Sequence, residues 1–193
     1  MMCDCASCDC CDGGCDSCGV PVSSVAMIGA GVPDFEFDVY QAKKISKRSI
    51  SDYNGKWLVL FFYPANFTFV CPTELEELQS YYSKMQAEGA EVLSISTDTA
   101  FAHKVWHDSS EAIGKVEYGM ASDANHQLAE YFNVLIEEEG VALRGTFIID
   151  PDGVLKAMEI NDNSIGRSAK ELLRKLQAAK FVREHGGNVC PAS

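Results

Sequence analysis

Cys71 stands at a point in the chain where a thiol could become reactive. Residues 57–63 form an apolar run rich in aromatic side chains, which is typical of a buried central strand. A loop follows, and Pro72 suits the first turn of a helix because its missing N–H has no role there. The unpaired N–H groups and the dipole at a helix start stabilise an anion. The pattern therefore favours a thiolate at Cys71, which could attack a peroxide oxygen.

The residues around Cys71 offer further groups for such chemistry. The hydroxyl of Thr68 could bond to the thiolate or to a peroxide oxygen, and Pro64 would shape the loop and exclude water. Glu74 and two further carboxylates in the same turn disfavour the thiolate, so a nearby cation is required. Arg144 is the candidate that we select, since a guanidinium can face a thiolate and a carboxylate together. The alternative is a cysteine that only fills space in the core.

The elements that must position these groups follow from the apolar spacing. Apolar residues recur three and four positions apart between Leu75 and Met85, which predicts a helix that Gly89 ends. A strand over 91–97 completes a strand–helix–strand unit. Further predicted elements are helices over 100–107 and 124–132, strands over 145–150 and 154–160 joined by the turn residues Pro151-Asp152-Gly153, and a last helix with a capping box at Ser168 and Glu171. We therefore expect an α/β fold with a mixed central sheet flanked by helices.

Composition narrows the class of protein and its partners. The 193 residues are 47% apolar and 23% charged, as in a folded globular domain. The net charge of −12 argues against nucleic acid or an anionic membrane as a partner. No apolar run approaches the roughly 20 residues of a membrane span. The first residues show no basic region followed by an apolar stretch, so we expect no secretory signal and a cytoplasmic location.

The cysteines divide the chain into two parts. Cys71 and Cys190 are isolated, and the other seven lie close to the N-terminus: Cys3, Cys5, Cys8, Cys10, Cys11, Cys15 and Cys18. We expect a Cys-rich extension over 1–20, a linker over 21–32 and a domain over 33–193. Such dense thiolates suit zinc, copper(I) or an iron–sulfur cluster, but the spacing names no metal. The alternatives are a disordered tail with adventitious thiols and a start codon placed too early.

Two histidines also have metal-like spacing. His103 and His107 lie four residues apart on a predicted helix, which is the geometry of a two-ligand face. No third ligand is evident nearby, so we expect both to be polar residues on an exposed face.

The residues around Cys71 carry a resemblance to a known family. The segment 62–75 contains the pattern Pro64-x-x-x-Thr68-x-x-Cys71, which resembles the active-site signature of the peroxiredoxins. The likeness continues through 96–98, 104–107, 144–151, 166–167 and 189–191, so that it covers roughly residues 33–193. It is greatest to the typical 2-Cys group.

This resemblance implies a thioredoxin-like fold and a role for each matched residue. Cys71 would attack the peroxide, and Cys190 of a partner chain would resolve the oxidised sulfur into a disulfide. The residues implied to activate Cys71 or to brace its surroundings are Pro64, Thr68, Arg144, Glu74, which would orient Arg144, and Arg167.

The activity implied is the reduction of hydrogen peroxide and organic hydroperoxides. Chemistry at sulfur needs no cofactor, and electrons would come from a disulfide reductase, either thioredoxin or a dedicated flavoprotein. The resemblance also implies head-to-tail homodimers, five of which often form a decameric ring with contacts around residues 101–106. Two alternatives remain from other classes: a ring-shaped holdase chaperone without enzymatic activity, and a metal-loaded redox sensor that acts through the N-terminal extension.

Overall fold

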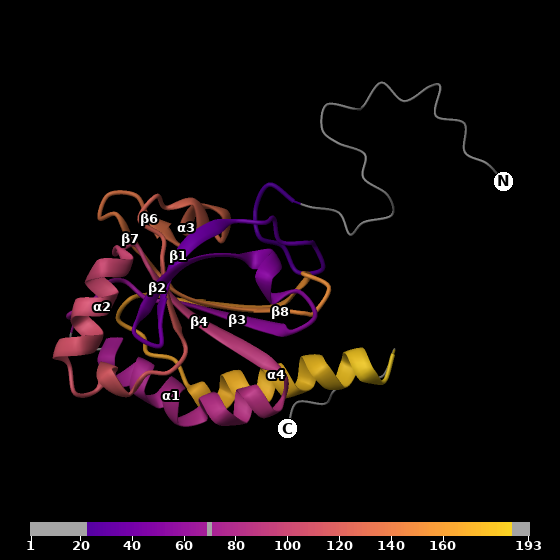
Figure 1. Ribbon diagram of the computed structural model, residues 1–193. Coiled ribbons are helices and arrows are strands. Elements are labelled where there is room, and N and C mark those ends of the chain that lie inside the picture. Colours follow the sequence, from indigo (N-terminus) through magenta and orange to yellow (C-terminus); the bar gives the residue numbers. More distant parts are fainter. Residues whose placement is uncertain (1–22, 69–70, 187–193) are drawn as a thin grey trace, which may run out of the picture.

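A mixed seven-stranded sheet forms the centre of the computed structural model, which describes residues 23–68 and 71–186 (Figure 1). Its strand order is β2-β1-β5-β4-β3-β8-β9, in which β3, β4 and β5 are parallel and the other neighbouring pairs are antiparallel. The strands are β1 (Glu36–Gln41), β2 (Lys44–Ser49), β3 (Trp57–Phe62), β4 (Ala90–Ser96), β5 (Gly119–Ser122), β8 (Arg144–Ile149) and β9 (Leu155–Asn161). Strands β6 (Leu135–Ile136) and β7 (Val141–Ala142) form a small separate sheet.

Helices cover both faces of this sheet, as predicted. Figure 1 shows α1 and α4 side by side on one face, with α3, β6 and β7 on the other. The helices are α1 (Cys71–Ala87), α2 (Ala100–Ser109), α3 (Gln127–Tyr131) and α4 (Ala169–Glu184), together with the 3-10 helices η1 (Ile50–Tyr53) and η2 (Ile113–Lys115). None of the described helices is long and apolar enough to cross a bilayer.

Strand β3 is the central strand that its apolar run predicts. All six of its residues are buried. Because side chains alternate along a strand, Val59 and Phe61 pack into the core beneath α1 and α4, whereas Leu60 and Phe62 pack into the core on the opposite face. A strand fixed from both sides holds its C-terminal end firmly, and the segment that leads to Cys71 begins at that end.

The predicted units around β3 are confirmed. Strands β3 and β4 are parallel and α1 connects them, while β8 and β9 pair antiparallel across the turn at residues 151–153, where Gly153 has φ 78°. The oxygen of Ser168 caps α4 by accepting from the N–H of Glu171.

The helix expected over 124–132 is shorter than predicted. Only Gln127–Tyr131 is helical, because the carboxylate of Asp123 accepts the N–H groups of Leu128 (2.9 Å) and Ala129 (2.7 Å) and so starts the helix later. His126, just before the helix, adopts a left-handed conformation with φ 62°. Strands β1, β2 and β5 were not predicted.

Residues 26–32, which fall in the expected linker, are attached to the domain. The N–H groups of Ala26, Gly29 and Val32 donate to the carbonyls of Tyr131, Leu155 and Gly153 at 2.8–2.9 Å.

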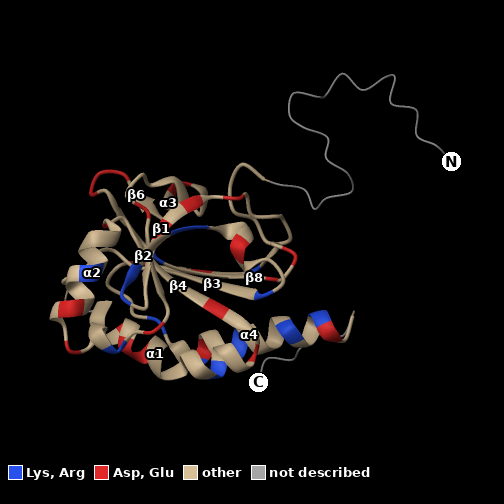
Figure 2. Ribbon diagram, in the orientation of Figure 1, with Lys and Arg blue, Asp and Glu red and all other residues tan. Residues whose placement is uncertain are grey.

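Acidic and basic residues are interspersed along α4 (Figure 2), where Arg174 pairs with Glu171. The Cys-rich extension over 1–20 and Cys190 lie outside the described residues.

Candidate active site

Cys71 is the first residue of α1, and its side chain is fully buried. It lies where the chain has left β3, passed through the loop that begins at Pro64, and started a helix of 17 residues. The positive end of the helix dipole and the unpaired N–H groups of the first turn therefore face the sulfur. This is the junction that the sequence predicts for a reactive thiol.

Arg144 supplies the cation that the sequence analysis requires. It is the first residue of β8, which pairs with β3, and its side chain is almost completely buried. Its Nη1 lies 3.6 Å from Sγ of Cys71 and also forms an ion pair with Oε2 of Glu74. Its Nε donates to the carbonyl of Asn163 at 2.9 Å. The guanidinium thus faces the thiol and the carboxylate together, held by a third contact from behind.

Glu74 connects Arg144 to the second arginine. It stands three residues after Cys71, about one helical turn away, so both side chains lie on the same face of α1. Oε1 of Glu74 accepts from the backbone N–H (2.8 Å) and Nε (3.2 Å) of Arg167, and Oε2 accepts from Nη2 (3.4 Å). Glu74 is 5% exposed and Arg167 is 8% exposed, so neither charge is screened by water.

Arg167 is braced on every side. Its Nη1 donates to the carbonyl of Gly145 (2.7 Å) and to the hydroxyl of Thr146 (3.0 Å), and its guanidinium lies 3.4 Å from the ring centre of Phe61. Burial lowers the pKa of Arg167, and the attraction of Glu74 opposes that effect. An arginine guanidinium stays protonated in proteins even when it is buried. The residue is therefore a fixed positive charge behind Glu74.

The charges of this buried cluster do not balance without Cys71. Among the described residues that touch one another here, two guanidinium groups face the single carboxylate of Glu74. A buried excess charge is unfavourable unless a partner neutralises it. Cys71 lies against this excess positive charge, with its Sγ 3.6 Å from Nη1 of Arg144.

The two other carboxylates of the first turn are engaged elsewhere. Glu76 pairs with Lys115 at the exposed surface, 3.6 Å away. Glu77 accepts the backbone N–H of Ala169 at 3.1 Å, at the start of α4. The crowding of acids that the sequence suggests is therefore distributed over three different partners.

Pro64 and Thr68 lie in the loop between β3 and α1, and both are partly buried. The hydroxyl of Thr68 donates to the carbonyl of Ala65 at 3.2 Å, while its oxygen keeps a lone pair that can accept another hydrogen bond. The backbone of Phe67 has φ 59°, a left-handed conformation that residues other than glycine rarely adopt. Pro64 and Thr68 thus belong to the loop that precedes α1 in the chain, and this loop contains a strained residue.

Several residues near the site were not found by sequence reasoning. They are Asn163 and Thr146, which hold the arginines, and Asn66 and His103, which hydrogen-bond to each other under the loop. The exposed face expected for His103 and His107 is wrong, because His103 is completely buried. No group of three or more metal-ligating side chains occurs within 23–68 and 71–186. The cysteines proposed as metal ligands lie outside those ranges.

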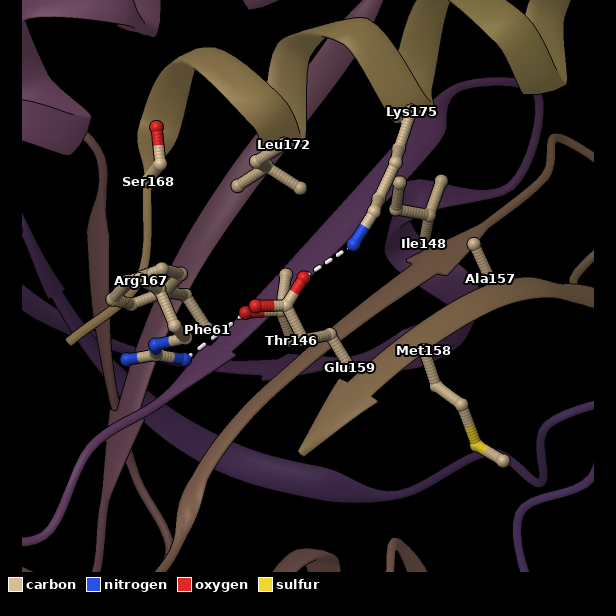
Figure 3. A pocket seen from close by; sticks show the side chains of 10 residues that line it. All are labelled: Phe61, Thr146, Ile148, Ala157, Met158, Glu159, Arg167, Ser168, Leu172 and Lys175. Atoms are coloured by element: carbon tan, nitrogen blue, oxygen red, sulfur yellow. Dashed lines mark hydrogen bonds and ion pairs between the residues drawn. The ribbon is translucent and has the colours of Figure 1, made fainter. Parts of the chain in front are cut away.

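A small cavity of about 10 Å³ lies beside Arg167, in the region drawn in Figure 3. Figure 3 shows Lys175 of α4 reaching across it to Glu159 of β9. Cys71 does not line the cavity, which has room for about one water molecule. This cavity therefore lies beside the contacts of Arg167 and is not the route by which a peroxide reaches the thiol.

Comparison with known proteins decides the family. The family model described as AhpC/TSA family matches residues 28–158. The chain belongs to this family. It is 51% identical to alkyl hydroperoxide reductase C of Staphylococcus epidermidis over 170 residues, which cover 87% of this chain and 90% of that protein. It is 49% identical to the protein of the same name from Bacillus subtilis over 168 residues, which cover the same shares of the two chains.

Solved structures of peroxiredoxins have the same fold as this chain. The crystal structure of Enterococcus faecalis AhpC superposes with a TM-score of 0.81 at 50% identity and covers 83% of this chain and 96% of that one. The reduced 2-Cys peroxiredoxin of Plasmodium vivax gives a TM-score of 0.81 at 30% identity and covers 86% and 88%. The chain therefore has the thioredoxin-like fold of the peroxiredoxins and is a thiol-dependent peroxidase. These relatives give no support to a holdase or a metal-loaded sensor.

Proposed function

We propose that Cys71 reduces hydrogen peroxide and organic hydroperoxides, and that Arg144, Glu74 and Arg167 stabilise its thiolate. The observation that supports this most directly is the guanidinium of Arg144 at 3.6 Å from Sγ, inside a buried cluster with one excess positive charge. A thiolate is the nucleophile that peroxide reduction requires. The names of the relatives, which include alkyl hydroperoxide reductase C, support the same class of substrate.

The reaction balances with the groups at hand. The thiolate of Cys71 attacks the terminal oxygen of R–O–O–H, the S–O bond forms and the O–O bond breaks. The oxygen stays on sulfur as a sulfenic acid, and the leaving alkoxide takes a proton to become an alcohol, or water when the substrate is hydrogen peroxide. Sulfur loses two electrons and the peroxide gains them. No cofactor enters this step.

Arg144 and the loop residues act on different parts of the step. As sulfur attacks, negative charge moves toward the leaving oxygen, and the fixed guanidinium of Arg144 can stabilise both ends of that movement. The remaining lone pair of Thr68 can accept a hydrogen bond from the O–H of the peroxide and so orient the O–O bond. Pro64 would shape this loop, and it lacks an N–H that would compete for the substrate.

Cys190 completes the catalytic cycle in this proposal. Its thiol attacks the sulfenic sulfur of Cys71 in a partner subunit, which forms a disulfide and releases water. A disulfide reductase, either thioredoxin or a flavoprotein, then returns two electrons and two protons.

Two exposed apolar regions support the assembly of several copies of this chain. Strand β9 is an outer strand of the described sheet with Met158 and Ile160 exposed, and could pair with a second copy, while Phe101 and Val105 of α2 could join dimers into a decamer.

The division of the chain into extension, linker and domain is part of the proposal, and the hydrogen bonds of residues 26–32 support counting these residues with the domain. The extension over 1–20 supplies seven cysteines, whose thiolates suit zinc or an iron–sulfur cluster. This metal site plays no part in the peroxidase step, which uses only Cys71 and its neighbours.

Intact mass under non-reducing conditions tests the proposal. One equivalent of peroxide should convert the wild-type chain into a disulfide-linked dimer. The Cys190→Ser variant should still consume its first equivalent and then gain the mass of one or two oxygens on Cys71. The Cys71→Ser variant should consume none. Full peroxide consumption by Cys71→Ser would overturn the assignment of the attacking thiol, and an intrachain disulfide would overturn only the intersubunit step.

A further inference from the structure

A buried neutral network lies under the loop that carries Pro64 and Thr68. His103 of α2 is fully buried, and its Nδ1 lies 3.1 Å from Nδ2 of Asn66. The hydroxyl of Tyr63, at the end of β3, donates to Oδ1 of Asn66 at 2.8 Å. The network thus joins three elements that are distant in sequence: the end of β3, the loop and the middle of α2.

The hydrogen bonds fix the tautomer of His103. Its Nε2 lies 3.0 Å from the carbonyl of Ala121 on β5, and a carbonyl can only accept, so Nε2 carries the proton. In a neutral imidazole, Nδ1 is then an acceptor. It accepts from the amide of Asn66, whose oxygen accepts in turn from Tyr63. The oxygen of Asn66 also lies 3.2 Å from Nδ1, but the amide N–H of Asn66 has Nδ1 as its acceptor only while His103 is neutral.

Asn66 transmits this arrangement to the backbone of the loop. Its own N–H donates to the carboxylate of Asp98 at 2.8 Å, so its side chain and main chain are both held. The next residue, Phe67, has the strained φ of 59°, and its ring packs 5.8 Å from that of Trp106, also on α2. A strained backbone persists only where its surroundings determine it. Asn66 is the anchor that precedes the strained residue.

We infer that His103 is a positioning residue for the peroxide reaction, which through Asn66 holds the loop so that Pro64 and Thr68 face Cys71. The inference rests on the proposed role of Cys71. The hydrogen bonds between His103, Asn66 and Tyr63 suit this task, because they fix the loop through neutral groups.

Protonation of His103 would change the arrangement. A proton on Nδ1 would repel the amide N–H of Asn66, which would lose its acceptor, and Nδ1 would donate instead to the amide oxygen, which already accepts from Tyr63. The groups that face the imidazole are the carboxylate of Asp98, the hydroxyl of Tyr63, the carbonyl of Ala121 and the amide of Asn66.

Burial decides the charge state of these groups at neutral pH. Burial lowers the pKa of His103, and the carbonyl of Ala121 and the charge of Asp98 oppose that effect. Burial also raises the pKa of Tyr63 well above its usual value, so its hydroxyl stays neutral. On α2 itself, Lys104 pairs with Asp108 at the surface.

Two substitutions at one position separate positioning from a general loss of stability. Asn66→Leu removes both the donor to His103 and the acceptor for Tyr63. Asn66→Asp keeps the acceptor and demands a proton on Nδ1, so that a charged His103 paired with the new carboxylate rebuilds the network. The matched control is His107→Leu, because His107 lies on the same helix and its Nε2 contacts a backbone carbonyl, that of Val116 at 3.2 Å, away from the loop.

The measurement is the second-order rate constant of each folded variant with hydrogen peroxide, from pH 5 to 9 or thereabouts. Asn66→Leu should lose about 10- to 100-fold at neutral pH, as expected for a small displacement of positioned groups. Asn66→Asp should stay within about threefold of the wild type, and His107→Leu should react like the wild type.

The pH profile and NMR supply readouts that a purely structural role would not move. The Asn66→Asp variant needs His103 charged and the wild type needs it neutral. The rate constant of Asn66→Asp divided by that of the wild type should therefore fall as pH rises. Any pH dependence that the two proteins share, such as that of the thiol, cancels in this ratio. Imidazole ¹⁵N shifts at neutral pH should show His103 neutral in the wild type and doubly protonated in Asn66→Asp.

Some results would overturn the inference. They are a wild-type rate for Asn66→Leu, an Asn66→Asp rate as low as that of Asn66→Leu, or a rate ratio that does not change with pH. The proposed function fails separately, through an active Cys71→Ser variant.

Discussion

Two buried polar clusters flank the start of α1, and they differ in charge. Beside the sulfur, Arg144, Glu74 and Arg167 form a charged cluster of two guanidinium groups and one carboxylate. Under the loop, Asn66 and His103 belong to a neutral network. The peroxide reaction moves negative charge at the first location and none at the second. Charge therefore lies where it can stabilise the reacting groups, and neutral hydrogen bonds lie where geometry alone is needed.

Removal of the cation nearest the sulfur should give the largest effect. Arg144→Ala leaves the thiolate without its contact at 3.6 Å and without the charge that stabilises the leaving oxygen. We expect the rate constant for peroxide to fall by about 100- to 1000-fold. Stopped-flow fluorescence or competition with a second peroxidase would measure it. Arg183→Ala is the control, since Arg183 pairs with Asp152 at the surface.

An Arg144→Lys variant sharpens the same prediction. A lysine keeps the charge but lacks the fork that contacts Cys71, Glu74 and the carbonyl of Asn163 together. It should recover only part of the loss. If Arg144→Ala reacted at the wild-type rate, the charged cluster would have to be described as a structural element, with catalysis assigned to other groups.

Removal of the carboxylate of Glu74 should lower the peroxide rate constant less than Arg144→Ala does. It should lower the free energy of unfolding strongly. In Glu74→Gln the two arginines lose their common anion, and removal of one partner from a buried ion pair costs about 3–5 kcal/mol. Urea unfolding should show this loss. We expect the peroxide rate to fall by about tenfold, because Arg144 keeps its bond to Asn163 but loses its orientation on the side of Glu74. An unchanged free energy of unfolding would contradict the view that Glu74 balances these charges.

The two clusters also differ in how far the sequence could predict them. The charged cluster was predicted, because Cys71 and Glu74 stand one helical turn apart in one motif and an acid-rich turn beside a thiolate requires a cation. Arg144 was selected as that cation from the charges alone, whereas Arg167 was identified only through the family resemblance, since nothing in the local sequence indicates that the segment before α4 meets α1.

The neutral network left no such signal. Histidine on a helix with no metal ligand nearby is usually exposed, and the partners that bury His103 come from distant segments, the loop at Asn66 and β5 at Ala121. In retrospect, Ala100, His103 and Trp106 recur every three residues as the buried face of α2. Strands β2 and β5 were missed for a related reason, because β2 is largely polar and exposed and β5 has only four residues, so neither shows an apolar run.

A smaller effect should appear in the pH dependence of stability. Because burial lowers the pKa of His103 below its ordinary 6.5, the unfolded chain binds this proton at a higher pH than the folded chain. Its contribution is therefore fully present above pH 6.5 and is lost as pH falls through the lowered value. The difference in free energy of unfolding between the wild type and His103→Leu should shrink from pH 7.5 to 5 or thereabouts. His107→Leu is the control.

NMR titration of the wild type checks the same point without a variant. A His103 signal that titrates at or above the ordinary range of histidine would contradict the neutral state on which the second cluster depends.

Deletion of residues 1–20 should have the smallest effect on catalysis. The deleted segment contains neither Cys71 nor any residue of the two clusters, and among the described residues the first backbone hydrogen bond to the domain is that of Ala26. We therefore expect the peroxide rate, the peroxide-induced disulfide and the free energy of unfolding to match those of the full chain. Metal analysis of both proteins, purified without oxygen, should find zinc or iron only in the full chain, because thiolates bind metal best while they are reduced. A metal-free full chain would contradict the metal site and leave the peroxidase unaffected. A large loss of peroxide reduction on truncation would instead mean that the extension contributes to the chemistry at Cys71, and the two clusters would then be an incomplete account of the site.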